Sequence, residues 1–209
     1  MSDWKVDATK ILSGAEIGQV LADLKRRAKR SINSRMNLVV FRLATCCGLR
    51  VSEIIGLRVG DVRVGVPKPY LGLRKEITKR HKPRRVPLWW DQGTLDDLTA
   101  WREYRVTSGA KPTEPLLCSQ AERSAGKPLD RQNARHRFKV ACRVLGIERV
   151  RGLTIHHGRH SFCSHAAKLR TLAEVRDAAG HSNAATTSIY LHIATDDDGE
   201  IGGMFAFGA

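Results

Sequence analysis

Hydrophobic positions in the early part of the chain recur at the spacing of amphipathic helices. Ser13 and Glu16 have the spacing of a capping box, which predicts that the first helix begins there. Its inward face carries Val20, Leu21 and Leu24. A second helix is predicted to end at Gly48, and a short third helix is expected at 51–57. The apolar positions of the second helix are Met36, Val39, Val40, Leu43 and Cys47.

The stretch 61–88 changes from helical spacing to alternation. Val62, Val64 and Val66 alternate with other residues, and two prolines then interrupt the run. Two further strand-like segments flank 80–83. We therefore expect a small antiparallel sheet of about three strands in this region.

Helical spacing returns from Leu95 onward. Polar capping residues predict three further helix starts. Asp130 begins a helix that extends to Gly146, and Thr154 begins a helix over 156–169. Thr171 forms a capping box with Glu174 and begins a helix that ends at Gly180. The expected fold class is α+β, mainly α-helical, with a small three-stranded antiparallel sheet. We expect one domain at 13–195, preceded by an extension at 1–12 and followed by a tail at 196–209.

The positive net charge of the chain indicates which classes of partner it can bind. Lys and Arg number 36 against 21 Asp and Glu, which gives a net charge of +15. Such an excess favours a polyanion, either nucleic acid or an anionic membrane surface. No apolar run approaches the roughly 20 residues that span a bilayer, and the N-terminus lacks a signal-peptide core. These features favour nucleic acid over a membrane and predict a cytoplasmic protein.

The cysteines give no sign of a metal or disulfide framework. The five are Cys46, Cys47, Cys118, Cys142 and Cys163, an odd number without any Cys-x-x-Cys pair. We expect buried free thiols in a reducing compartment. The sequence also lacks a carboxylate cluster typical of a two-metal nuclease, so we expect no metal and no other cofactor.

Three segments combine residues that suit phosphate chemistry. In the first, Gly-Leu-Arg-x-Ser-Glu places Arg50 at a helix start, where its guanidinium and the free N–H groups can face one phosphate. In the second, His156 and Arg159 lie three apart on one helix face. His156 and His160 also have zinc-ligand spacing, but His157 replaces the Glu that a metalloprotease motif requires.

The third segment lies near the C-terminus. It reads Gly-His followed by Thr-Thr-x-x-Tyr, with nine positions from His181 to Tyr190. A tyrosine can attack phosphorus when cations hold the transition state and an acid protonates the leaving oxygen. These groups together describe DNA cleavage without a metal.

In order and spacing, the three segments resemble the boxes of the tyrosine recombinases and phage integrases. By that resemblance the catalytic residues are Arg50, Lys79, His156, Arg159, His181 and Tyr190, with Glu53 as a supporting carboxylate. The family usually has Leu where this chain has Gly158, and we expect looser helix packing there. The resemblance implies a site-specific recombinase that rejoins DNA through a 3′-phosphotyrosyl link. His156 would be the proton acceptor or hydrogen-bonding partner of Tyr190.

The lysine is assigned from a hairpin whose family counterpart carries a lysine several residues before Val-Pro-Leu. Lys79, eight positions before Pro87, fits best, and Lys82 is the alternative. Phosphate contact without catalysis is the competing interpretation for any cation of this hairpin. The residues expected to bind DNA are Arg74, Lys75, Arg80, Lys82, Arg84 and Arg85.

The resemblance also concerns assembly. Larger family members carry an N-terminal domain that clamps the opposite DNA face, and only twelve residues precede Ser13 here, so we expect weaker DNA affinity and steep salt dependence. Tetramers on double-stranded DNA are implied. The tail residues Met204, Phe205 and Phe207 are expected to dock on a neighbouring protomer or on their own domain. A type IB topoisomerase-like enzyme and a non-catalytic DNA-binding protein are the alternative functions.

Overall fold

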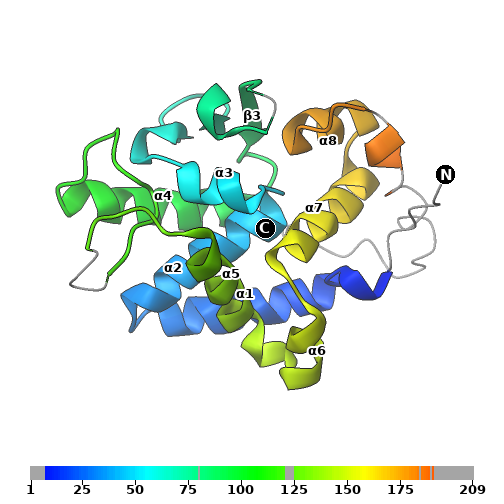
Figure 1. Ribbon diagram of the computed structural model, residues 1–209, viewed down its shortest axis with the longest axis horizontal. Coiled ribbons are helices and arrows are strands. Elements are labelled where there is room, and N and C mark those ends of the chain that lie inside the picture. The colour runs from blue at the N-terminus through cyan, green and yellow to red at the C-terminus, as the bar shows by residue number, and fades with distance from the viewer. Residues whose placement is uncertain (1–7, 80, 121–124, 184, 189, 191–209) are drawn as a thin grey trace.

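The computed structural model describes residues 8–79, 81–120, 125–183, 185–188 and 190 (Figure 1). Its helices are α1 (Gly14–Ala28), α2 (Ile32–Phe41), α3 (Val51–Gly56), α4 (Gln92–Thr107), α5 (Arg131–Ala141), α6 (Ile147–Gly152), α7 (Ile155–Leu169) and α8 (Leu172–Ala179). Short helical turns are η1 (Ala8–Lys10), the π-helical η2 (Arg42–Cys46), η3 (Val59–Asp61), η4 (Lys75–Ile77) and η6 (Cys142–Leu145). The strands are β1 (Val62–Arg63), β2 (Tyr70–Leu73) and β3 (Arg84–Pro87).

Several helices begin where local capping residues predict. Glu16 N donates to Ser13 Oγ at 3.2 Å, and Ser13 N donates to Glu16 Oε2 at 2.8 Å. Asp130 accepts from a first-turn backbone N–H of α5 at 2.7 Å, and Thr171 forms the same reciprocal box with Glu174. These caps satisfy N–H groups that helix starts leave without partners, so the predicted starts are confirmed.

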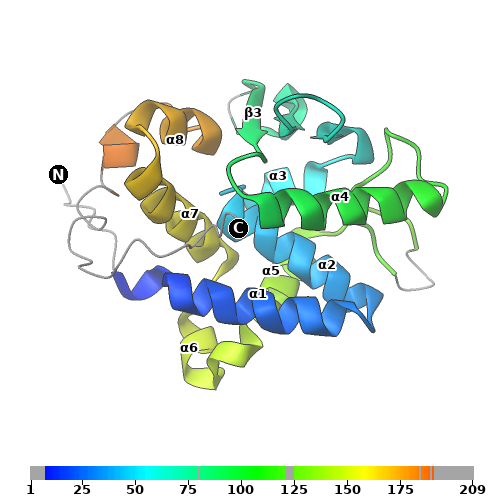
Figure 2. The same cartoon turned by 180° about the vertical axis from the view of Figure 1, so that it is seen from behind.

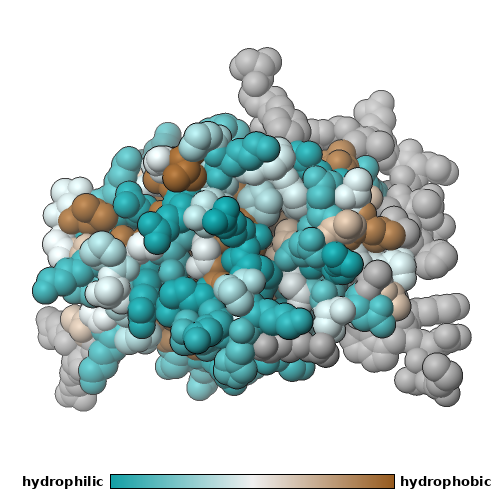
Figure 3. Space-filling model, turned by 90° about the horizontal axis from the view of Figure 1, so that it is seen from above, coloured by the Kyte–Doolittle hydropathy of each residue, from teal (hydrophilic) through white to brown (hydrophobic). Residues whose placement is uncertain are grey.

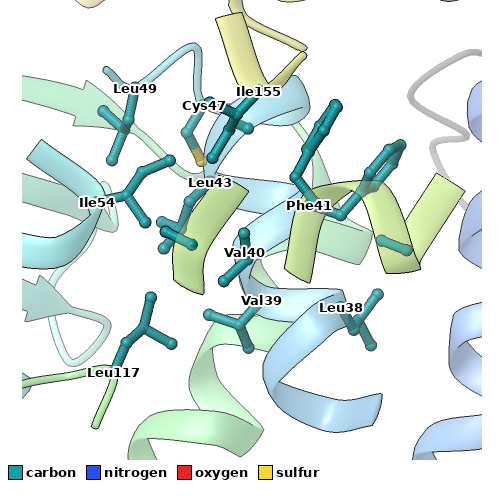
Figure 4. Packing of buried hydrophobic residues seen from close by; sticks show 14 of the residues in the cluster. Leu38, Val39, Val40, Phe41, Leu43, Cys47, Leu49, Ile54, Leu117 and Ile155 are labelled. Carbon is teal, nitrogen blue, oxygen red and sulfur yellow. The ribbon is translucent and has the colours of Figure 1, made fainter. Parts of the chain in front are cut away.

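The core forms around α2. Its residues Val39, Val40 and Phe41 are at most 1% exposed and point to neighbouring helices (Figure 4). The ring of Phe41 stacks on that of Phe138 in α5, with centroids 5.8 Å apart. Burying one such side chain contributes about 1.5–3 kcal/mol. Helices α3 and α7 lie on one side of this core (Figure 1), and α4 crosses the other (Figure 2).

The predicted sheet is confirmed as three antiparallel strands in the order β1-β2-β3. The first strand is shorter than the valine alternation predicted, because pairing with β2 ends at Arg63 opposite Tyr70. Val66 is 39% exposed beyond it. The prediction of a strand through Val66 was therefore wrong, since alternation without a partner strand does not sustain pairing.

The segment before α1 packs onto the helical body. Leu12 is fully buried, and its N–H donates to Ser161 Oγ in α7 at 2.9 Å. Arg149 of α6 donates to the Ile11 carbonyl at 2.8 Å. The packed part of the chain therefore begins before Ser13. Within the described residues, no helix is both long and apolar enough to cross a membrane.

Candidate active site

Arg50 begins α3 directly after a left-handed turn at Gly48, whose φ is 63°. A Cβ at Gly48 would lie 2.3 Å from Cδ1 of Phe162, so glycine lets α7 pack against this turn. The Arg50 guanidinium donates to Glu53 Oε1 at 3.2 Å and to the Gly180 carbonyl at 3.4 Å. Its side chain stays 25% exposed, which leaves donors available to a ligand.

Glu53 is fully buried beneath Arg50. It accepts hydrogen bonds from Nη1 and Nη2 of Arg84 at 2.7 and 2.9 Å, and from the backbone N–H of Arg50 at 2.8 Å. Burial alone would raise the pKa of Glu53, but the hydrogen bonds and charges of Arg84 and Arg50 outweigh it and hold the pKa below its usual value. The ionised carboxylate therefore holds Arg50 in place.

The cations predicted to bind DNA fall into two groups. Arg84 is 11% exposed and also donates to the Ala178 carbonyl at 3.0 Å, so it joins β3, α3 and α8. Arg74 donates to both Asp61 oxygens at 3.1 Å and to the Gly56 carbonyl at 2.7 Å. Both guanidinium groups therefore have acceptors within the protein, while Arg74 stays 26% exposed and Arg84 also lines the groove that contains Arg50. The exposed cations are Lys75, Lys82 and Arg85, and Arg80 lies outside the described residues.

A groove of about 540 Å³ lies between the β2–β3 hairpin and the end of α8. The side chains that concern the chemistry are Arg50, Lys79, Lys82 and His181. Lys79 therefore shares a groove with Arg50, as the predicted acid requires. Lys82 lines the same groove, so both lysines stay candidates. Seen from the side of the sheet and α8, the surface is predominantly hydrophilic (Figure 3), as a site for a polyanion should be.

Arg159 lies in the first half of α7 and is only 3% exposed. Its Nη1 donates to the Gly48 carbonyl at 2.6 Å, whereas its buried Nη2 has no hydrogen-bond partner among the described residues. Burial, together with the positive charge of Arg50, lowers the pKa of Arg159 to about 10, so it remains protonated near neutral pH. A buried cation with a spare donor beside a second guanidinium is suited to an anion such as phosphate.

Gly158 does not loosen the packing of α7, and that expectation was wrong. A Cβ at this position would lie 2.9 Å from Thr45 Oγ1, 3.1 Å from the Ala44 Cβ and 3.1 Å from the Phe138 ring. The missing side chain therefore lets α7 approach η2 and α5 closely. This close approach fixes the helix that carries Arg159.

Tyr190 is 4% exposed and contacts two histidines. Its hydroxyl lies 2.5 Å from Nδ1 of His160. Its ring is nearly parallel to that of His181, with centroids 6.2 Å apart and an 11° angle. Burial raises the pKa of Tyr190, the Cys163 thiol adds to this, and Arg159 opposes it. The phenol is thus protonated near neutral pH.

The histidines of the site are all held neutral near pH 7. Burial and the charges of Arg159 and Arg50 lower the pKa of His181 to about 3. Burial and neighbouring positive charges lower the pKa of His160 to about 4. His156 is exposed at the surface, yet partial enclosure and Arg159 also lower its pKa. Neutral imidazole can both accept and donate a hydrogen bond, as phosphoryl chemistry requires.

Two parts of the site were not predicted from the sequence. His160 directly follows Arg159, at the position where the family's second box has His or Tyr, but that pattern assigns it no partner. Its contact with Tyr190 spans thirty positions, so the sequence did not predict it. Arg135 and Lys139 of α5 line a second groove together with His156. A signal for these two existed, because α5 contains no acidic residue.

Histidine and cysteine side chains are also candidate metal ligands and disulfide partners. No cluster of three or more His, Cys, Asp or Glu residues that suits a metal occurs in the part of the chain that the structure describes. The His156 and His160 pair therefore lacks a third ligand there. All five cysteines are buried free thiols, which confirms that prediction.

The sequence of this chain is similar to those of known DNA recombinases. Residues 10–196 match the phage integrase family. The chain is 33% identical to tyrosine recombinase XerD of Yersinia pestis over 158 residues, covering 71% of this chain and 47% of that protein. It is 31% identical to tyrosine recombinase XerD of Pseudomonas aeruginosa over 195 residues, covering 88% and 58%. The chain thus spans about half the length of these relatives.

A solved structure shares the fold. The XerH site-specific recombinase, crystallised with its difH substrate after cleavage, superimposes with a TM-score of 0.69 at 21% identity. The match covers 89% of this chain and 50% of that one. The likeness supports the architecture of a helical body with a three-stranded sheet. The family match covers residues 10–196, which is most of this chain, and the structure brings the motif residues together. The chain therefore belongs to the phage integrase family.

Proposed function

We propose that this chain is the catalytic part of a site-specific DNA recombinase that breaks and rejoins DNA through a 3′-phosphotyrosyl intermediate. The position of His181 carries the proposal. Arg159 and Arg50 are the charges that most lower its pKa after burial, and its ring stacks on Tyr190. Two guanidinium groups, an imidazole and a phenol therefore meet in one small region. These are the groups that phosphoryl transfer by a side-chain nucleophile requires.

The proposed reaction assigns one task to each group. The oxygen of Tyr190 attacks phosphorus, and the bond to the 5′ oxygen breaks. Arg50 and Arg159 donate to the non-bridging oxygens; Nη2 of Arg159 is buried and has no hydrogen-bond partner among the described residues. His181 adds a donor, and Lys79 protonates the departing 5′ oxygen. Removing one such donor typically costs about 10²–10³ in rate. The phosphotyrosyl bond conserves the energy for rejoining, so the proposed reaction uses neither ATP nor a metal.

Double-stranded DNA is the proposed partner. Lys79 and Lys82 line the groove with Arg50, and Lys75 and Arg85 are exposed cations of the same hairpin. The net charge of +15 favours binding whose affinity falls steeply with salt. Action on DNA implies a cytoplasmic location at the nucleoid.

We further propose self-association on DNA, to a tetramer, as the family resemblance implies. An apolar pocket between the β3–α4 connection and α7 supports an intersubunit contact, since Leu88, Trp90 and Leu169 line it. The proposed occupant is the tail at 196–209, which lies outside the described residues. Sedimentation with and without DNA tests this, and a species that stays monomeric on DNA would contradict it.

Covalent trapping tests the proposed function. Protein is mixed with fragmented DNA in the presence of EDTA, denatured, and assayed for adducts. The expected result is an adduct with the wild-type chain and none with Tyr190→Phe. Transfer of the trapped strand to a new partner strand supports recombination, whereas resealing to its own strand supports a topoisomerase-like activity. Equal adduct formation by Tyr190→Phe would refute the proposal.

A further inference from the structure

The hydroxyl of Tyr190 is held by a histidine that the three sequence segments give no task. His160 Nδ1 lies 2.5 Å from the Tyr190 oxygen, and the two residues are only 8% and 4% exposed. A candidate base must lie within hydrogen-bond distance of the proton that it removes. His160 meets this condition.

His156 occupies a different place on the same helix. It lies one turn before His160, is exposed, and lines the second groove with Arg135 and Lys139. Its ring meets that of His160 edge to face, with centroids 4.5 Å apart. His156 therefore faces the cationic surface that suits phosphate, while His160 faces the phenol. His156 was expected to contact both the phosphate and Tyr190, whereas the structure places His156 at the groove and His160 at Tyr190.

The surroundings of His160 favour the neutral form that a base must have. The charges and titratable groups facing it come from its own helix, as His156, His157 and Arg159, and from the N-terminal segment, as Lys10. All of these are cationic or become so, and with burial they lower the pKa of His160 to about 4. The ring is therefore free of an added proton at neutral pH.

We propose that His160 is the catalytic residue that accepts the proton of Tyr190 as the phenol attacks phosphorus; this inference rests on the proposed function. The O–H bond breaks, its proton goes to His160 Nδ1, and its electron pair forms the bond to phosphorus. The bond from phosphorus to the 5′ oxygen breaks, and that oxygen takes a proton from the proposed acid, Lys79. Rejoining reverses each transfer. His160 then returns the proton to the released phenol.

The first test needs no DNA. Nitrogen NMR of histidine-labelled protein at pH 7, with His160→Asn for assignment, reports which ring nitrogen carries hydrogen. The expected result is hydrogen on Nε2 and a lone pair on Nδ1 facing Tyr190. Hydrogen on Nδ1 would make the ring a donor to the phenol oxygen and would overturn the proposal, whatever the DNA experiments give.

The second test separates base from acid. DNA with sulfur replacing the bridging 5′ oxygen has a leaving group that needs no protonation. On this substrate Lys79→Ala is expected to recover cleavage, whereas His160→Asn stays slower than wild type by about 10²–10⁴-fold. Asn retains an acceptor at the position of Nδ1 but cannot take the proton, so it controls for positioning. Near wild-type cleavage by His160→Asn would show a merely positioning role, and absence of any wild-type adduct would instead refute the proposed function.

Discussion

Replacing Arg84 by alanine should destabilise the fold, because it removes the main partner of a fully buried carboxylate. Glu53 has no exposed area and takes two hydrogen bonds from Arg84, at 2.7 and 2.9 Å. Removing one partner of a buried ion pair typically costs about 3–5 kcal/mol. Arg50 still donates to Glu53, so we expect the lower end, about 3 kcal/mol.

The assay is urea unfolding followed by circular dichroism, with Arg85→Ala as the matched control. Arg85 is the next residue, is exposed, and lies 4.6 Å above the ring of Tyr70. Its loss should cost only about 0.5–1 kcal/mol, as for an exposed cation over an aromatic ring. For a chain of 209 residues, about 3 kcal/mol corresponds to a melting temperature lower by about 6–12 °C.

A second variant checks the cause. Glu53→Gln combined with Arg84→Ala removes the uncompensated charge, so the double variant should be more stable than Arg84→Ala alone. If Arg84→Ala unfolds like Arg85→Ala, or if the double variant is the least stable of all, the buried pair is not what holds β3 to α3. The reasoning about Arg50 would then fail with it.

The remaining predictions concern acid stability, packing and DNA binding. The pKa of the Glu53 carboxyl is lower in the folded than in the unfolded state. Ionised Glu53 therefore stabilises the fold above the unfolded pKa, and this stabilisation is lost as the pH falls through the folded pKa. The difference in unfolding free energy between wild type and Glu53→Gln, measured by urea unfolding, should shrink below about pH 4.5. Gly158→Leu should cost about 1–3 kcal/mol by overpacking, because even its Cβ lies 2.9 Å from Thr45; a melting temperature equal to wild type would contradict this. Lys82→Ala should reduce the slope of log affinity against log salt by about 0.9; fluorescence anisotropy titrations in a salt series measure the slope, and a slope equal to that of wild type would contradict a phosphate contact by Lys82.

The parts of this fold that sequence predicts are those set by neighbouring residues. The caps at Ser13, Asp130 and Thr171 act through hydrogen bonds across three positions. The residues that form each cap can therefore be recognised from a short stretch of sequence. The strand through Val66 failed because strand length depends on the partner that β2 offers. Gly158 was misread for a similar reason, since its contacts with Thr45 and Phe138 come from distant segments.

The same distinction applies to the site. The residue types and order of Arg50, Arg159 and Tyr190 were visible as motifs. The partners that set their behaviour were not, because Arg84 reaches Glu53 across 31 positions and His160 reaches Tyr190 across 30. Tertiary contacts gave Arg84, an arginine predicted to contact DNA, a buried carboxylate as its ion-pair partner. They also brought His160, a histidine without an assigned role, against the hydroxyl of Tyr190.

The most direct measurement of the central claim is the chemical identity of the trapped bond. Adducts formed in EDTA are digested with nuclease and protease, and the modified peptide is sequenced by mass spectrometry. The account predicts a nucleotide joined through its 3′ phosphate to the oxygen of Tyr190. A phosphate on another side chain, or cleaved DNA with free ends and no linked peptide, would contradict it.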